Sequence, residues 1–244
     1  MQPLTVIFFS CRRMDILYET INSFIKFNKY PLKEFIIVND SADPSIHKRL
    51  KETYQNFTFI LNKENVGLMK SIDLAYPYIN TEYFFHAEDD WKLTAPNFIE
   101  NSMKLMEARP EIEEVWPRLY NIHDAEPEVL SAGGVHYRLV TQFHLQGQDG
   151  PYGWHGFSTA FSLKRKSDYM KVAPYCSVPW LGSPIGNTIW QREQAIGEEY
   201  RKLGYRTAVI TDSKGNVQNY AINIGYGKSE YVNKTEKDGR NDKY

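Results

Sequence analysis

Short runs of apolar and β-branched residues alternate with longer amphipathic stretches through the first half of the chain. The short runs predict strands at residues 4–10, 35–38, 57–61 and 83–86. Helices are predicted after the first run, where Leu17, Ile21, Phe24 and Ile25 have helical spacing, after Asp43-Pro44, and at residues 67–78 and 96–108. This alternation is typical of βαβ units and indicates an α/β fold with a mostly parallel sheet flanked by helices.

The second half of the chain is less regular. Strands are predicted at residues 115–120, 135–141, 157–163, 207–211 and 217–224, separated by loops that contain Gly and His. A long helix is predicted at residues 185–203, with Gly197 inside it. Residues 229–244 are charged and nearly free of aliphatic side chains, so we expect a flexible tail or a lid that becomes ordered on binding.

The length and composition of the chain suit one domain. A chain of 244 residues with 42% hydrophobic content can bury one sizeable core. We therefore expect a single domain over residues 1–228, made of a first half, residues 1–110, and a second half, residues 111–228.

The charges of the chain nearly cancel, with 29 Lys and Arg against 30 Asp and Glu. No global field therefore attracts nucleic acid or anionic lipid, and a charged ligand must be bound by local groups. No apolar run is long enough for a transmembrane segment, and residues 4–10 are too short for a secretion signal. Cys11 and Cys176 are the only cysteines, which favours reduced thiols and a cytoplasmic location, with peripheral attachment to a membrane left open.

Polar clusters follow three of the predicted strands. Residues 10–13 follow the first strand, residues 39–41 the second and residues 88–90 the fourth. Ligands of an open parallel sheet bind beyond the carboxyl ends of its strands, so we expect these clusters to share one edge.

The acidic cluster carries the most chemical information. Glu88 and Asp90 are separated by one residue, so both can bind a hard divalent ion that also takes waters and phosphate oxygens. A diphosphate leaving group requires such neutralisation of its charge. The alternative is a solvated acidic turn.

Together these motifs resemble the GT-A glycosyltransferases, in particular the large inverting family 2. The similar segments are Asn39-Asp40-Ser41, the sequence Asn-Lys-Glu-Asn-Val-Gly-Leu-Met-Lys-Ser at 62–71 and Phe-Phe-His-Ala-Glu-Asp-Asp-Trp at 84–91. The resemblance covers about residues 4–100 and extends more loosely to about residue 229. It implies the GT-A fold of nucleotide-diphospho-sugar transferases, whose Rossmann-like N-terminal half binds the nucleotide sugar and whose second half binds the acceptor.

The resemblance also implies roles for individual residues. Asp40 would contact the donor base, and the Asp-x-Asp motif, here Glu88-Asp89-Asp90, would hold the metal and the donor ribose or diphosphate. Basic side chains near the strand ends suit phosphate oxygens. The predicted donor-binding residues are Ser10, Arg12, Arg13, Asp40, Lys70, Asp89 and Lys228. A turn residue remains the alternative for Asp40, and a solvated helix residue the alternative for Lys70.

The chain departs from the family at the metal site. Family members often show His-Ile-Gly near the carboxyl end, whose His completes the site, whereas this chain has Asn223-Ile224-Gly225. The side-chain carbonyl oxygen of Asn suits a hard cation such as Mg²⁺ or Mn²⁺ better than it suits a softer metal. We therefore predict Glu88, Asp90 and Asn223 as ligands of a divalent cation, Mn²⁺ or Mg²⁺.

An inverting transfer needs a carboxylate that takes the proton of the acceptor hydroxyl. In the family this residue lies near the start of a helix that precedes a Gly and a returning strand, and Glu193 occupies that place. Asp149 is the second candidate, and a surface charge beside Arg192 and Glu198 is the alternative for Glu193.

Other polar and aromatic residues favour structural roles. His86 and His144 are expected to be structural, and the aromatic residues at 154–157 either face a sugar or pack on the core. The first strand is followed by no Gly-rich loop of the nucleotidyltransferase kind, and no dinucleotide or P-loop motif occurs.

The sequence thus predicts a glycosyltransferase of the hexosyltransferase type. It would move a sugar, with inversion and with a metal, from a UDP- or GDP-sugar to a hydroxyl of a glycan or glycoconjugate acceptor. The alternative is a non-catalytic carbohydrate- or nucleotide-binding protein on a degenerate GT-A fold.

Overall fold

Strands and helices alternate in the first half of the chain, as the sequence predicts. The computed structural model describes residues 1–118, 125–147, 150–179 and 189–225. The strands of this half are β1 (Leu4–Ser10), β2 (Leu32–Asn39), β3 (Thr58–Leu61), β4 (Tyr83–Glu88) and the short β5 (Trp91–Leu93). Its helices are α1 (Met14–Phe27), α2 (Pro44–Thr53), α3 (Leu68–Ala75), the 3₁₀ turn η1 (Tyr76–Tyr78) and α4 (Phe98–Ala108).

The second half contains more strands than helices. The strands are β6 (Ile112–Trp116), β7 (Leu130–Ala132), β8 (Val135–Leu139), β9 (Phe143–Gly147), β10 (Gly150–Trp154), β11 (Ser162–Arg165), β12 (Arg206–Thr211) and β13 (Ala221–Asn223). The helices are α5 (Lys166–Val172), the 3₁₀ turn η3 (Tyr175–Ser177) and α6 (Ile189–Lys202).

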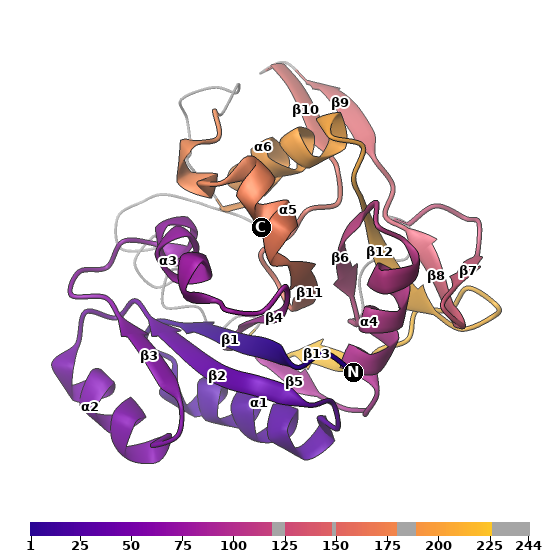
Figure 1. Ribbon diagram of the computed structural model, residues 1–244. Coiled ribbons are helices and arrows are strands. Elements are labelled where there is room, and N and C mark those ends of the chain that lie inside the picture. Colours follow the sequence, from indigo (N-terminus) through magenta and orange to yellow (C-terminus); the bar gives the residue numbers. More distant parts are fainter. Residues whose placement is uncertain (119–124, 148–149, 180–188, 226–244) are drawn as a thin grey trace.

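A central sheet with strand order β3-β2-β1-β4-β11-β6-β12-β8-β7 connects the two halves (Figure 1). Strands β3, β2, β1 and β4 form a parallel block, and β6 and β12 form a second parallel pair. The antiparallel strand β11 lies between them, and antiparallel β8 and β7 follow β12. The predicted α/β fold, a large and mainly parallel sheet flanked by helices, is confirmed.

Strand β1 is buried on both faces, which explains why its sequence is a continuous apolar run. Leu4, Val6 and Phe8 pack in one core cluster with residues of α1 and α4. Ile7 and Phe9 point to the opposite face and pack with residues of α3 and α6. Figure 1 shows α1 and α3 on opposite sides of β1 and β2. The helices therefore sandwich the parallel block and leave the carboxyl ends of its strands to the loops that follow them.

Several predicted elements differ from the observed ones in extent. The strand predicted at 157–163 begins only at Ser162, and the strand predicted at 217–224 is regular only at β13, with an isolated bridge at Val217. Of the four apolar residues with helical spacing in α1, Leu17, Ile21 and Phe24 are buried, whereas Ile25 is 50% exposed. Strands β5, β7, β9 and β10 and helix α5 were not predicted, since such short elements depend on pairing across the fold.

None of the helices in the described part of the chain combines the length and apolar character needed to cross a bilayer.

Candidate active site

The carboxyl ends of three parallel strands meet at one edge of the sheet. In the register of β1 with its neighbours, Ser10 lies opposite Asn39 of β2, and Phe9 lies opposite Glu88 of β4. The polar clusters that follow the three strands are therefore neighbours in space, as the sequence analysis expected. The Ser10 hydroxyl donates to the carbonyl of Val38 at 3.3 Å and accepts from Asn39 Nδ2 at 2.9 Å, which links the first two strand ends.

Arg13 lies against the acidic cluster. Its Nη2 forms an ion pair with Asp89 Oδ1 and a second with Asp90 Oδ2 at 3.2 Å. Asp89 is almost fully buried, and burial raises its pKa to about 7, although the charge of Arg13 opposes the shift. Arg13, one of the basic residues predicted to bind the donor, thus contacts the acidic cluster directly.

One carboxylate oxygen of Asp90 differs from the other acidic oxygens of the cluster. Its Oδ1 is buried and has no hydrogen-bond partner among the described residues. A buried carboxylate oxygen without a donor is costly, so such an atom requires a ligand or an explanation. Asp90 is therefore the residue of the cluster best placed to accept a cation.

Strand β13 brings the carboxyl-terminal motif to the acidic cluster. It pairs antiparallel with β5, so that Asn223 lies opposite Trp91, and the backbone N–H of Ile224 donates to the carbonyl of Asp90 at 2.8 Å. The exposed Asn223 uses its Oδ1 to accept the N–H of Gly225 at 2.9 Å. The predicted ligands Glu88, Asp90 and Asn223 thus lie within one region of the fold, although more than a hundred residues separate Asn223 from the other two.

Among the residues that the structure describes, no group of three or more His, Cys, Asp or Glu side chains is arranged to hold a metal ion. The atoms that could bind a metal here are carboxylate and amide oxygens, whose chemistry suits a hard cation. The unpartnered oxygen of Asp90 fits such a cation as well, and Arg13 already supplies positive charge at the same place.

Glu88 and Glu193 act on each other across the site. Burial, together with the negative charges of Asp90, Glu193 and Asp89, raises the pKa of Glu88 to about 8. Glu88 accepts a long hydrogen bond, 3.4 Å, from the indole of Trp91. The structure therefore brings the candidate base on α6 into the electrostatic range of the acidic cluster at the end of β4.

One oxygen of Glu193 is held by the loop between β10 and β11. Its Oε1 accepts from the backbone N–H of Thr159 at 2.6 Å, from the Thr159 hydroxyl at 2.8 Å and from the Ser158 hydroxyl at 3.2 Å. Burial raises the pKa of Glu193, while these hydrogen bonds and the charge of Arg118 oppose the shift. Glu193 is thus a partly buried and oriented carboxylate, in contrast to the surface charge that was its alternative.

Arg118 is a site residue that the sequence analysis missed. It is buried, its Nε donates to the carbonyl of Phe161 at 3.2 Å, and its guanidinium lies 5.1 Å from the ring centroid of Trp91 and 4.4 Å from that of Trp116. Nothing in the local sequence distinguishes it from a surface Arg, because its aromatic partners come from other segments.

Asp40 organises the loop that precedes α3. Its Oδ1 accepts from the N–H of Val66 at 2.9 Å and from Asn62 Nδ2 at 2.8 Å, and its Oδ2 accepts from the N–H of Gly67 at 2.8 Å. Gly67 has a φ of 82°, a backbone conformation that favours glycine. Asp40 thus fixes the turn into α3. Among the described residues its Oδ2 accepts one hydrogen bond, so this oxygen can accept another from the base of a bound nucleotide.

The remaining predicted residues are placed as follows. Arg12 and Lys70 are exposed, with Lys70 in the first turn of α3. Asp149 and Lys228 lie outside the described residues, as does the predicted tail at 229–244. His86 is fully buried, bonds to the Tyr76 hydroxyl through Nδ1 at 2.7 Å and stacks on Phe9 at 4.6 Å. Burial lowers the pKa of His86, so that a neutral structural histidine fits its surroundings.

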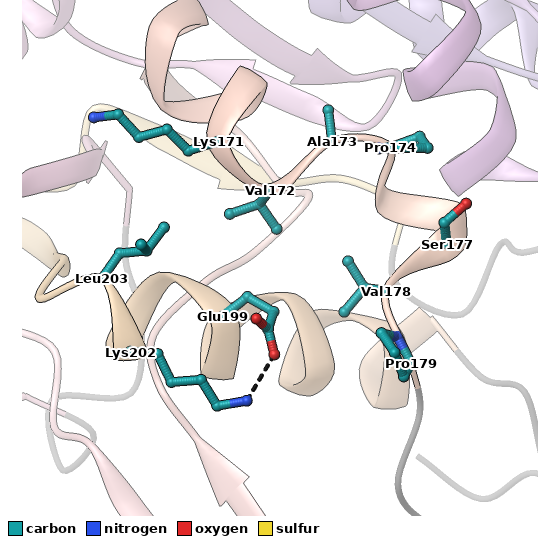
Figure 2. A pocket seen from close by; sticks show the side chains of 10 residues that line it. All are labelled: Lys171, Val172, Ala173, Pro174, Ser177, Val178, Pro179, Glu199, Lys202 and Leu203. Atoms are coloured by element: carbon teal, nitrogen blue, oxygen red, sulfur yellow. Dashed lines mark hydrogen bonds and ion pairs between the residues drawn. The ribbon is translucent and has the colours of Figure 1, made fainter.

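A surface cavity of about 280 Å³ lies between the α5–η3 segment and the last turns of α6. Figure 2 shows Val172, Val178 and Leu203 directed toward it, with the ion pair of Glu199 and Lys202, 2.8 Å, at its rim. None of the predicted site residues that the structure describes lines this cavity, so it is separate from the site at the strand ends.

A mainly parallel α/β sheet with an acidic loop at its strand ends, a returning strand behind that loop and a facing carboxylate on a late helix defines a glycosyltransferase of the GT-A fold. The family model for glycosyl transferase family 2 matches residues 5–172. The chain belongs to this family. No curated protein sequence matches the chain significantly.

Solved structures support the same fold. The mannosyltransferase PcManGT of Pyrobaculum calidifontis, in complex with GDP-Man and Mn²⁺, has a TM-score of 0.55 and 15% identity over 93% of this chain and 59% of its own. TarS of S. aureus, residues 1–349, has a TM-score of 0.56 and 13% identity over 90% of this chain and 59% of its own. GalNAc-T7 with UDP, GalNAc and Mn²⁺ has a TM-score of 0.55 and 12% identity over 85% and 42%. This chain therefore spans three fifths or less of each of these chains.

Proposed function

We propose that this glycosyltransferase moves a hexosyl group from a UDP- or GDP-sugar to a hydroxyl of a glycan acceptor, with inversion at the anomeric carbon and with Glu193 as the base. The observation that supports it best is the pairing of two kinds of carboxylate in one site. The acidic cluster at the end of β4 suits a diphosphate with its cation, while Glu193 faces it from α6 as an oriented carboxylate with a raised pKa.

In this reaction the acceptor oxygen attacks the anomeric carbon from the face opposite the diphosphate. The proton of the acceptor hydroxyl passes to Glu193, the new bond between carbon and acceptor oxygen forms, and the bond from carbon to the diphosphate oxygen breaks. The bonding electrons leave with the nucleoside diphosphate. Since the three hydrogen bonds to Glu193 end on Oε1, they fix the direction of the carboxylate before the acceptor binds.

On the donor side, Asp90 would hold a divalent cation, Mn²⁺ or Mg²⁺, with Glu88 and Asn223 as further oxygen ligands. A cation bound there would neutralise charge on the leaving diphosphate. Arg13 remains close enough to the cluster to bind phosphate oxygens, and the exposed Arg12 and Lys70 could attract the donor. Two of the similar structures contain Mn²⁺ with GDP-Man or with UDP, which supports the proposal for this chain.

We also propose that residues 1–228 act as one catalytic domain, with the donor half before about residue 110, and that residues 229–244 close on the bound donor. Lys228 would then reach the donor from that end of the chain. Asp149 remains the second candidate for the base.

The test is a panel of UDP-, GDP- and dTDP-sugars scored for slow donor hydrolysis, with and without Mn²⁺. A glycosyltransferase should release the nucleoside diphosphate from one class of donor. Binding of a nucleotide sugar without any turnover, in the presence of candidate glycan acceptors, would instead support a non-catalytic binding protein.

A further inference from the structure

A buried ion pair lies behind Glu193, in the middle of the central sheet. Lys164 of β11 and Glu114 of β6 are cross-strand partners in the register of the two strands. Glu114 is 0% exposed and Lys164 is 4% exposed. Removing two charges from water is expensive, and a buried pair often stabilises a fold no better than apolar residues of the same volume. The pair therefore requires an explanation beyond core packing.

The donors around Glu114 leave neither of its oxygens free. Oε1 accepts from the backbone N–H of Ser158 at 2.9 Å and from the indole of Trp116. Oε2 accepts from the Ser162 hydroxyl at 3.2 Å and from Lys164 Nζ. Burial lowers the pKa of Lys164 to about 8, and the charges of Glu113 and Glu193 oppose this effect, so the ammonium stays mostly protonated at neutral pH.

Ser158 is held by both members of the pair. Its N–H donates to Glu114, and its carbonyl oxygen accepts from Lys164 Nζ at 2.8 Å. The other side of the same segment holds the candidate base, because the Ser158 hydroxyl and the N–H and hydroxyl of Thr159 all donate to Glu193 Oε1. Residues 158 and 159 thus form a bridge with the ion pair at one end and Glu193 at the other.

We propose that the Lys164–Glu114 pair is a positioning device for the base: it fixes the backbone of Ser158 and Thr159, which in turn fix the carboxylate of Glu193. The proposal rests on the proposed function of Glu193. It accounts for the irregular backbone at residues 157–161, where the sequence pattern predicts a strand. In a regular strand the N–H groups of Ser158 and Thr159 would bond to neighbouring strands. Here the N–H of Ser158 donates to Glu114 and the N–H of Thr159 donates to Glu193.

Two variants test the proposal. Lys164→Met leaves Glu114 buried without its cation, whereas the double variant Glu114→Gln/Lys164→Met removes both charges and leaves no isolated charge in the core. Each folded variant should lose about tenfold or more in kcat, because a displaced base is costly to the reaction, while donor KM and UDP or GDP affinity stay within about twofold. Glu88 and Arg118, two charged groups near Glu193, are unchanged in both variants, and both variants lack the charge of Lys164, so their comparison keeps that loss constant.

Asp168→Asn is the matched control. Asp168 is 2% exposed and pairs with Arg165 at the start of α5, but it contacts neither Ser158 nor Glu193. This variant also breaks a buried ion pair, so it should lower the melting temperature and leave kcat nearly unchanged. Equal losses of kcat in Asp168→Asn and in the double variant would mean that the Lys164–Glu114 pair has only a structural role, and would overturn the proposal.

Hydrogen exchange separates this proposal from the proposed function. The amide of Thr159 donates to Glu193, so its exchange should become at least about tenfold faster in the double variant and stay slow in Asp168→Asn. This result is expected whether or not a donor has been found. Absence of transfer by the wild type with every donor would count against the proposed function alone, whereas unchanged exchange at Thr159 or normal kcat in the folded double variant would overturn the positioning role.

Discussion

At the scale of single residues, the site depends on carboxylates that have very different surroundings. One oxygen of Glu193 accepts hydrogen bonds from the protein, and Asp89 forms an ion pair with Arg13. One oxygen of Asp90 has no hydrogen-bond donor among the residues that the structure describes. The three carboxyl groups have similar chemistry but different partners. We therefore expect substitutions of Glu193 and Asp90 to affect different quantities, turnover in the first case and Mn²⁺ binding in the second.

Glu193→Gln should abolish most turnover without affecting the donor. The amide oxygen of Gln can still accept from Thr159, but the side chain cannot take a proton from the acceptor hydroxyl. General-base catalysis contributes about two to four orders of magnitude in rate, so kcat should fall by about that factor. This loss corresponds to roughly 3 to 5 kcal/mol of transition-state stabilisation. Steady-state kinetics measures the loss, and calorimetric titration with UDP or GDP should show nearly unchanged affinity.

The stereochemistry of the product provides the second check on Glu193. A single displacement gives an inverted anomeric carbon, which nuclear magnetic resonance of the first-formed product detects. Retention of configuration would refute the single displacement, and near-normal turnover of Glu193→Gln would transfer the role of base to Asp149.

Asp90→Asn should weaken the binding of Mn²⁺ by about tenfold or more, because a neutral amide replaces a carboxylate whose Oδ1 accepts no hydrogen bond within the described part of the chain. Titration of the protein with Mn²⁺ alone, followed by electron paramagnetic resonance, measures this directly. Asp15→Asn changes an exposed carboxylate in the first turn of α1 and should bind Mn²⁺ as the wild type does. Equal Mn²⁺ affinity in both variants would exclude Asp90 as a ligand.

At the scale of elements, the short strands β5 and β13 are decisive because they carry Gly225 to the acidic cluster. A Cβ placed on Gly225 would lie 2.3 Å from Asp90 Oδ2 and 2.7 Å from Arg13 Nη1. Both distances are shorter than a contact permits, so a side chain at this position must displace the Asp90–Arg13 pair. The glycine of the Asn-Ile-Gly motif is thus required by close packing against the site.

Gly225→Ala should therefore impair donor binding much more than it impairs folding. We expect UDP or GDP affinity in the presence of Mn²⁺ to fall by about tenfold or more, and the free energy of unfolding to fall by about 1–3 kcal/mol, as is typical of overpacking. Ile222→Ala on β13 is the control, because that side chain is 40% exposed. Wild-type affinity in Gly225→Ala would show that the contact with Asp90 has no role in binding.

The same elements mark the limit of what the sequence predicts. The apolar run of β1 and the acidic residues after β4 are local signals, and both were placed correctly. Strand β5 has only three residues, which form a strand because β13 pairs with them. Arg118 was missed for a related reason: its surroundings include Trp91 and Trp116, which the sequence alone does not place beside it. Local pattern therefore predicts the frame of the site, while its non-local contacts come from the fold.

At the scale of the whole molecule, the fold keeps several carboxyl groups out of water. Burial raises the pKa of Glu88 to about 8 and those of Asp89 and Glu113 to about 7. The unfolded chain releases these protons near pH 4, so between roughly pH 5 and pH 8 these three carboxyl groups hold more protons in the folded protein than in the unfolded one. The lowered pKa of His86 opposes them with a single proton below about pH 6.5. By linkage, the free energy of unfolding must decrease as the pH rises through this window.

The protein without ligands should therefore melt at its highest temperature near pH 5 and several degrees lower at pH 8. Below about pH 4.5 the stability should fall again. Hydrogen bonds from Arg109 and Arg201 lower the pKa values of Glu111 and Glu198, and protonation of these two carboxylates breaks their ion pairs with the arginines. Scanning calorimetry from pH 4 to pH 8 measures the profile. A melting temperature that rises steadily from pH 5 to pH 8 would contradict buried, protonated carboxyls.

Glu113→Gln identifies one source of the slope. Gln is neutral at every pH and its amide oxygen can keep the hydrogen bond from the Thr207 hydroxyl, 2.7 Å in the wild type, so the variant should lose part of the decrease between pH 5 and pH 7. Its melting temperature should equal that of the wild type near pH 5 and exceed it by a few degrees at pH 8.

Glu111→Gln, two residues away on the surface, should leave the decrease intact and affect only the acidic side of the profile, because the pKa of Glu111 is shifted downward. Parallel profiles of Glu113→Gln and the wild type would mean that Glu113 is already ionised in the fold, with Lys164 as its counter-charge, and the slope would then have to come from Glu88 and Asp89 alone.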